Sequence, residues 1–218
     1  MYPSSCLIEC QCLPPVHVMS TLLRYDIVYW EAHENYQKRS YRSRCQITNA
    51  QGPETMVVPL RKGKNAQTPI QLVDISYSDD WTAHWNNQLH QAYRAAPYYI
   101  YYIDGLVGLL SRKYEKLWEF NSCLFQWLLD TIELPIEWQV TKTYERNPAS
   151  QTDLRDLFRP SQVPQNASVL TYPQVYEDRH GFVPGLSTLD LLMCLGPEAK
   201  VYLTRLSEAI DDEQRRSQ

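Results

Sequence analysis

The feature that most constrains the fold is a strand–loop–helix–strand pattern at the start of the chain. Residues 6–12 read CLIECQC, which is typical of a buried strand, and a Leu-Pro-Pro loop at 13–15 ends it. Residues 16–25 have helical character, and residues 26–32, DIVYWEA, again resemble a buried strand. This order of elements is typical of a parallel crossover unit. The sequence therefore predicts an α/β protein.

A hairpin is expected after this unit. Residues 44–48 and 55–60 read RCQIT and TMVVPL, and they flank a turn over residues 49–53. Residues 69–77, PIQLVDISY, alternate in a way that predicts one more strand. Together these segments predict an N-terminal mixed sheet of the βαβ type with a hairpin.

The second half of the chain is expected to be mainly helical and packed on this sheet. The apolar period changes at Asp79 or Asp80, either of which can cap a helix, and the helical middle covers about residues 79–132. The expected elements are helices at 81–92, 97–114, 115–132, 187–195 and 198–210, and a short strand at 137–143. Residues 145–171 are polar, contain three prolines, and predict a long loop with one short turn at DLRDLF. We expect one domain over residues 1–210 and a disordered tail at 211–218.

A basic segment follows the second strand directly. Residues 33–44 read HENYQKRSYRSR and hold four cations in a chain of formal net charge −4. A helix would cluster Lys38, Tyr41 and Arg42, whereas a strand would align alternate residues on one face. The strand face would consist of Tyr36, Lys38, Ser40, Arg42 and Arg44. In either geometry at least two cations converge, and Arg binds phosphate or carboxylate well.

The basic segment has two interpretations. Lys and Arg commonly protect an exposed edge strand, which would explain the charges structurally. However, α/β proteins bind ligands where a buried strand ends, and this segment starts there. We therefore expect an anion-binding site. The expected substrate-binding residues are Asn35, Gln37, Lys38, Arg39, Ser40, Arg42 and Arg44. His33 with Glu34 is a candidate pair for moving a proton.

A second group of polar residues lies near the C-terminus. His180 is the first candidate for a general acid or base, although, taken alone, a loop histidine bound to a carbonyl oxygen is the better explanation. Ser187 and Asp190 have the spacing of a capping box, and the helix they begin would offer free amides to an anion. We count both as substrate-binding candidates. We expect the basic segment and this helix end to face a shared cleft.

Other protein classes fit the sequence less well. A pI near 5.7 argues against a nucleic-acid-binding protein. The cysteines lack a CxxC pair and no histidine has zinc-finger spacing, so we expect buried thiols and no metal. The chain has neither a basic leader followed by an apolar run nor an apolar stretch of about 20 residues, so we expect a cytoplasmic protein without membrane insertion. The cofactor and the oligomeric state stay open.

Several motifs, taken in order, resemble the WbqC-like protein family over about residues 6–206. They are the Leu-Pro-Pro loop at 13–15, NYQKRSYRSR at 35–44, a Gly-Pro turn followed by VVP, and GFVPGLSTLDLL at 181–192, which leads to LGPEA. The chain departs from the family pattern at Glu9 and Gln11, where Gln-Pro is usual, and at Ser43, where Asn is usual. His33–Glu34 replaces a more acidic pair.

The resemblance implies a function. The family is associated with bacterial surface-polysaccharide biosynthesis and with modification of an amino sugar. A group transferase for an acyl or aminoacyl group is therefore expected, which binds an anionic substrate such as a nucleotide sugar through its Lys/Arg cluster. The alternative is a non-catalytic binding or scaffold protein for a glycan intermediate or an acidic partner.

Overall fold

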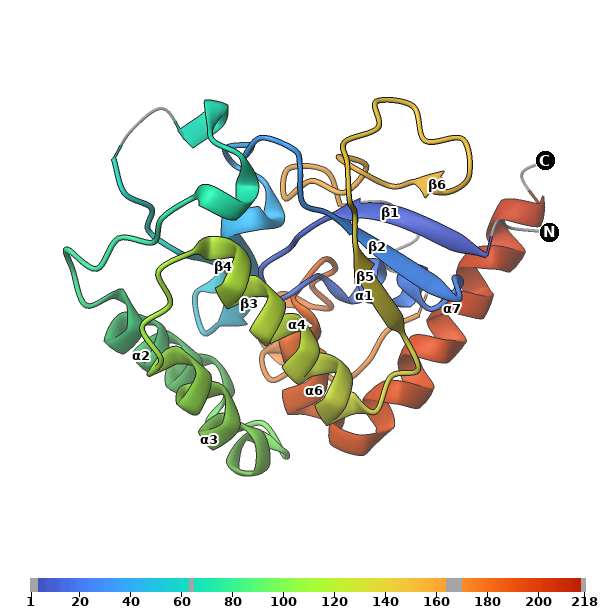
Figure 1. The fold of residues 1–218 in the computed structure, drawn as a ribbon. Coiled ribbons are helices and arrows are strands. Elements are labelled where there is room, and N and C mark those ends of the chain that lie inside the picture. The colour runs from blue at the N-terminus through green and yellow to red at the C-terminus, as the bar shows by residue number, and fades with distance from the viewer. Residues whose placement is uncertain (1–3, 63–64, 164–169, 217–218) are drawn as a thin grey trace.

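A parallel sheet forms the centre of the fold. The computed structural model describes residues 4–62, 65–163 and 170–216 (Figure 1). Strands β1 (Ser5–Glu9) and β2 (Ile27–Glu31) pair in parallel, and helix α1 (Val16–Leu22) connects them. Strands β5 (Glu137–Val140) and β6 (Thr152–Asp153) complete the order β5-β2-β1-β6, and every pairing in it is parallel. The predicted crossover unit is confirmed.

Helix α4 (Leu117–Ile132) packs on one face of the sheet and buries apolar side chains of its strands. On that face the Trp30 ring lies 4.7 Å from the Phe125 ring and 5.8 Å from the Trp118 ring, measured between centroids. Buried parallel strands need apolar side chains along most of their length, which accounts for the nearly continuous apolar residues in β1.

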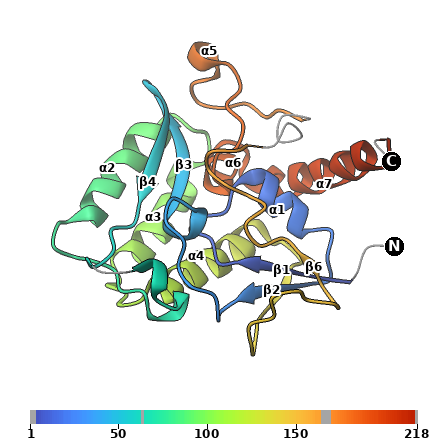
Figure 2. The ribbon, with the colours of Figure 1, turned by 90° about the horizontal axis from the view of Figure 1, so that it is seen from above.

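The predicted hairpin forms a separate two-stranded sheet. Strand β3 (Arg44–Asn49) pairs antiparallel with β4 (Gly52–Val57), so the turn between them is only residues 50 and 51. Helix α2 (Trp81–Tyr93) lies beside the hairpin (Figure 2), and the Trp85 indole N–H donates to the Val57 carbonyl at 3.2 Å. Asp80 caps α2 by accepting from the Ala83 amide at 3.1 Å, as predicted.

The remaining helices confirm a mainly helical second half. They are α3 (Tyr99–Leu110), α5 (Glu177–His180), α6 (Thr188–Leu195) and α7 (Ala199–Arg216). Single 3-10 turns occur at η1 (Tyr41–Ser43), η2 (Asn65–Gln67), η3 (Ile70–Leu72) and η5 (Gly196–Glu198). The α/β class with N-terminal strands and later helices is therefore confirmed.

Three segments differ from the prediction. Residues 69–77 form η3 and isolated bridges rather than a strand; Ile70, Val73 and Ile75 are buried against the core without strand pairing. The polar loop at 145–171 contains β6, which the sequence pattern missed because two residues show no periodicity. Helix α7 continues to Arg216, six residues past its expected end; residues 217 and 218 of the expected tail lie outside the described residues.

Buried side chains from both halves of the chain form one hydrophobic cluster. It extends from Cys6 in β1 to Ile210 in α7 and includes residues of the hairpin and of α2, α3, α4 and α6. Within the described ranges, no helix is both long and apolar enough to cross a membrane.

Candidate functional site

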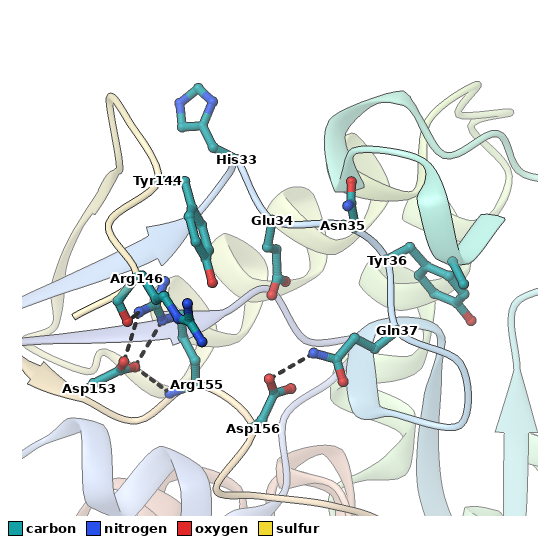
Figure 3. A pocket seen from close by; sticks show the side chains of 11 residues that line it. His33, Glu34, Asn35, Tyr36, Gln37, Tyr144, Arg146, Asp153, Arg155 and Asp156 are labelled. Atoms are coloured by element: carbon teal, nitrogen blue, oxygen red, sulfur yellow. Dashed lines mark hydrogen bonds and ion pairs between the residues drawn. The ribbon is translucent and has the colours of Figure 1, made fainter. Parts of the chain in front are cut away.

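A polar cavity lies at the carboxyl edge of the parallel sheet. Because all four strands run the same way, the ends of β1, β2 and β6 at Glu9, Glu31 and Asp153 share this edge. The cavity has a volume of about 590 Å³, and we call it the edge cavity (Figure 3). It is lined by His33, Glu34, Asn35, Tyr36, Gln37, Ala66, Tyr144, Arg146, Asp153, Arg155 and Asp156.

Arg42 lies beneath the edge cavity and is fully buried. Its guanidinium donates two hydrogen bonds to Glu34, at 2.7 and 2.6 Å, and one to Asp156 at 3.1 Å. The Asn121 side chain on α4 donates to the Arg42 carbonyl at 2.8 Å, which holds the backbone there. This arginine therefore binds the protein's own carboxylates, which differs from the expected contact with substrate.

Three carboxylates surround this one guanidinium. Glu9 is buried, accepts from the Gln11 amide at 2.9 Å, and accepts from the Asp156 backbone N–H at 3.0 Å. Asp156 adopts a left-handed φ of 60°, which non-glycine residues rarely adopt. Burial raises the pKa of Glu34 to about 7, although Arg42 opposes the shift, and burial also raises the pKa of Glu9. Glu34 is therefore suited to exchange a proton near neutral pH.

Arg155 closes the other side of the edge cavity. It donates to Glu31 at 2.9 Å and to Asp153 at 2.7 Å, and it lies 5.0 Å from the centre of the Tyr144 ring. Its cation is thus neutralised within the protein. The Arg146 side chain, which lines the same cavity, makes no hydrogen bond or ion pair with the described residues.

A second cavity of about 300 Å³ adjoins the first, and we call it the cationic cavity. Lys38, Arg39 and Arg44 line it, and none of its described lining residues is an Asp or Glu. Tyr36 lines both cavities, and its hydroxyl lies 2.7 Å from the Ser43 hydroxyl. Arg39 has a left-handed φ of 58°, so the chain turns sharply between the two cavities.

The structure thus brings most of the expected residues to two neighbouring cavities. His33, Glu34, Asn35 and Gln37 line the edge cavity, and Lys38, Arg39 and Arg44 line the cationic cavity. Ser40 donates to the Gln37 carbonyl at 2.7 Å and so shapes the turn that joins them. The His33 ring is exposed and lies 3.1 Å from the Thr141 carbonyl.

His180 is not part of this arrangement. It is exposed in α5, lines neither cavity, and its ring nitrogen lies 3.3 Å from the Ala50 carbonyl in the hairpin turn. Figure 2 shows α5 far from the ends of β1 and β2. The contact with the Ala50 carbonyl agrees with the structural interpretation of His180, in which a loop histidine binds a carbonyl oxygen.

Ser187 and Asp190 lie elsewhere, in the core. Ser187 caps α6 by accepting from the Leu189 amide at 3.2 Å, but Asp190 accepts from the Tyr172 hydroxyl at 2.8 Å rather than completing a capping box. The Thr188 amide donates to the Pro14 carbonyl at 2.8 Å, so the first amides of α6 are occupied. Burial raises the pKa of Asp190 to about 6. The expected cleft shared with the basic segment is absent from the described cavities.

Sequence reasoning missed six charged residues of this edge. They are Glu9, Glu31, Arg146, Asp153, Arg155 and Asp156. One available signal was an acidic residue at the end of each apolar strand, in CLIE and IVYWE, because such residues meet at one edge of a parallel sheet. Residues 152–156, TDLRD, carried no strand pattern that would have placed them there.

The cysteines show no sign of reactivity. Cys6, Cys10, Cys12, Cys45 and Cys194 are buried, and all six thiols are free. Burial raises the pKa of Cys6 and of Cys10 to about 12, which disfavours the nucleophilic thiolate. They act as small apolar side chains in the core.

The fold and the site define an α/β protein with a charged pocket at the carboxyl edge of a parallel sheet. The chain belongs to the WbqC-like protein family, whose model matches residues 10–163. The match includes the basic segment, whereas the GFVPGLSTLDLL segment lies beyond it. Neither the curated proteins nor the solved structures include a match to this chain.

Proposed function

We propose that this protein is a group transferase of surface-polysaccharide biosynthesis, which moves an acyl or aminoacyl group onto an amino sugar bound as a nucleotide sugar. The observation that carries the proposal is the pair of adjacent cavities, one cationic and one lined by carboxylates, amides and two arginines. The association of the WbqC-like family with surface polysaccharides supports the choice of an amino sugar.

The cationic cavity would hold the phosphates. Lys38, Arg39 and Arg44 repel one another when the cavity is empty, and a diphosphate would relieve this repulsion through charge-assisted hydrogen bonds. The Arg44 Nε atom is buried and has no hydrogen-bond partner among the described residues, so it has a donor to offer. We assign Arg42 no part in this contact, because it lines neither cavity and its Nε and Nη2 atoms already donate to Glu34 and Asp156.

The edge cavity would hold the sugar. Asn35 and Gln37 present amide groups that suit hydroxyl groups, and Glu34 would accept the proton from the attacking amine. In this step the sugar nitrogen bonds to the carbonyl carbon of an activated acyl donor, such as a thioester. The bond from that carbon to the donor's sulfur breaks, and the thiolate leaves. His33 at the rim is a second candidate for the proton, whereas His180 has no role in this scheme.

The anion site is tested by isothermal titration with a panel of nucleoside diphosphate sugars. Replacing Lys38 and Arg39 together by Ala should raise the dissociation constant at least about tenfold, the scale of one charge-assisted hydrogen bond. Lys113→Ala removes an exposed cation outside both cavities and serves as the matched control. Equal affinity in the double variant and the control would refute the anion site.

A second experiment measures both the rate of group transfer and the dissociation constant of the nucleotide sugar, which separates catalysis from binding alone. Glu34→Gln keeps the size of the side chain and one of the two acceptor oxygens that face Arg42, but it removes the ability to take a proton. The transferase proposal expects loss of transfer with the dissociation constant changed less than about twofold. His180→Ala should leave turnover unchanged. If no variant affects anything except affinity, the protein is a binding or scaffold protein for a glycan intermediate or an acidic partner.

A further inference from the structure

A third cavity lies between the end of the hairpin and helix α2, and we call it the amide groove. Its volume of about 550 Å³ is within the usual range for small-molecule sites, about 300–1,000 Å³. None of its described lining residues lines the edge cavity or the cationic cavity. Five of them are carboxamides: Asn49, Gln51, Asn87, Gln88 and Gln91.

The helical wall of the groove follows from the spacing of residues on α2. His84, Asn87, Gln88 and Gln91 lie at intervals of three and four, so they form one polar stripe along the helix. The apolar residues of α2, such as Trp85, turn to the core instead. The opposite wall is the hairpin end, where the tight turn exposes the side chains next to it.

Glu54 orients two of the carboxamides. Its carboxylate accepts from the Asn49 amide and from the Gln88 amide, both at 2.5 Å. Gln88 is only 8% exposed, and its carbonyl oxygen has no hydrogen-bond partner among the described residues. A buried acceptor without a donor costs stability, so this oxygen is suited to receive a hydrogen bond from a ligand in the groove.

Helix α5 and Tyr176, which precedes it, contact the elements that form the groove, although neither contributes to its described lining. The Tyr176 hydroxyl donates to the backbone carbonyl of Gln91 at 2.7 Å, and the His180 ring nitrogen lies 3.3 Å from the backbone carbonyl of Ala50. The short helix therefore touches both walls, and Figure 2 shows it beside the hairpin end. His180 thus borders this groove and not the proposed active site.

We propose that the amide groove binds an uncharged saccharide. Each carboxamide offers both donors and an acceptor, which suits hydroxyl groups that also donate and accept. The described lining contains neither Lys nor Arg, so it does not suit phosphate. Apart from Pro53 it lacks an apolar side chain, so it does not suit the side chains of a bound peptide. This inference uses no residue of the proposed active site and stands independently of it.

The groove is tested by nuclear magnetic resonance of the nitrogen-15-labelled protein during titration with two uncharged probes, tri-N-acetylchitotriose and maltotriose. At least one should shift the side-chain amide signals of Asn87 and Gln91. Replacing both residues by Ala should raise the dissociation constant about tenfold, because hydrogen bonds to the sugar are lost. Gln71→Ala, an exposed carboxamide outside the groove, should change it less than about twofold.

Three results would overturn the inference. The first is that neither trisaccharide shifts the groove signals at millimolar concentration. The second is that an uncharged blocked peptide, acetyl-Gly-Asn-Gly-amide, shifts them at a lower concentration than both sugars. The third is equal sugar affinity in the double variant and in Gln71→Ala. Binding of nucleotide sugars, measured in the same double variant, should stay unchanged and thereby separates this test from that of the proposed active site.

Discussion

Arg42 illustrates how a single residue can have a role that its sequence context hides. It belongs to the basic segment, yet it is fully buried, and its partners Glu34 and Asp156 lie at the edge cavity. A buried ion pair is costly to break from one side, because the other charge is left without a partner. Its contribution is therefore to stability, whereas its exposed neighbours Lys38 and Arg39 are available to a ligand.

We predict that Arg42→Ala destabilises the protein by roughly 3–5 kcal/mol, because it leaves buried carboxylates without their cation. Urea denaturation measures the change. Arg39→Ala is the matched control: this arginine is exposed, and its removal should change the free energy of unfolding by less than about 0.5 kcal/mol. Similar stabilities for the two variants would contradict the role assigned to Arg42.

Glu34 predicts a pH dependence of stability. Burial raises its pKa from 4.5 to about 7. Between these values the folded protein keeps a proton that the unfolded chain has released. The contribution of Glu34 to the free energy of unfolding is therefore fully present below pH 4.5. It is lost as the pH rises through about 7, and the loss is roughly 3 kcal/mol at most.

Glu34→Gln removes this titration, so its free energy of unfolding should fall less steeply between pH 4.5 and 7 than that of the wild type. Urea denaturation of both proteins at several pH values checks the prediction. Parallel curves would show that another group carries the proton, and Glu9, whose pKa is also raised by burial, would be the next to test.

At the scale of elements, the end of helix α6 depends on one glycine. Gly196 has a φ of 54°, and a Cβ atom there would overlap the ring of Tyr98, the residue that precedes α3. The Tyr98 amide also donates to the Met193 carbonyl at 3.1 Å. The close approach of these two segments therefore requires a residue without a side chain.

We predict that Gly196→Ala destabilises the protein by more than about 2 kcal/mol, since it combines backbone strain with overlap. Gly108→Ala is the matched control on α3, where a Cβ atom would contact nothing within 4 Å. That variant should be stabilised by about 0.5–1 kcal/mol, because Ala favours a helix more than Gly does. Thermal denaturation of both variants measures the contrast, and equal melting temperatures would contradict it.

Elements also show where sequence patterns are informative. Helix α4 was predictable because Leu117, Phe120, Leu124 and Leu128 follow the helical period and are all buried. Residues 69–77 alternate like a strand, but they pair only through isolated bridges, because no continuous strand edge runs beside them among the described elements. Strand β6 is only two residues long and exists because β1 offers it a parallel edge.

At the scale of the whole molecule, the chain is predicted to unfold as one unit. The hydrophobic cluster joins β1 and β2 with the helices of the second half, so neither half has a separate core. The single domain expected for residues 1–210 thus remains a prediction with a direct test. Far-ultraviolet circular dichroism follows the helices, and tryptophan fluorescence follows Trp30 and Trp85 in different parts of the core. The two denaturation curves should coincide; separate midpoints would indicate two domains.

The sequence by itself determined the parallel crossover, the hairpin, the long helices and the position of the basic segment, because each depends on residues close together in the chain. Only the tertiary structure decided which charges are free. Arg42 meets Glu34 eight residues away and Asp156 at a separation of 114 residues, and no local pattern encodes the second contact. Charges interact through space, so the partners of each cation depend on how the fold brings the strand ends together. In this fold Arg42 pairs with carboxylates of the protein, whereas Lys38, Arg39 and Arg44 line a cavity.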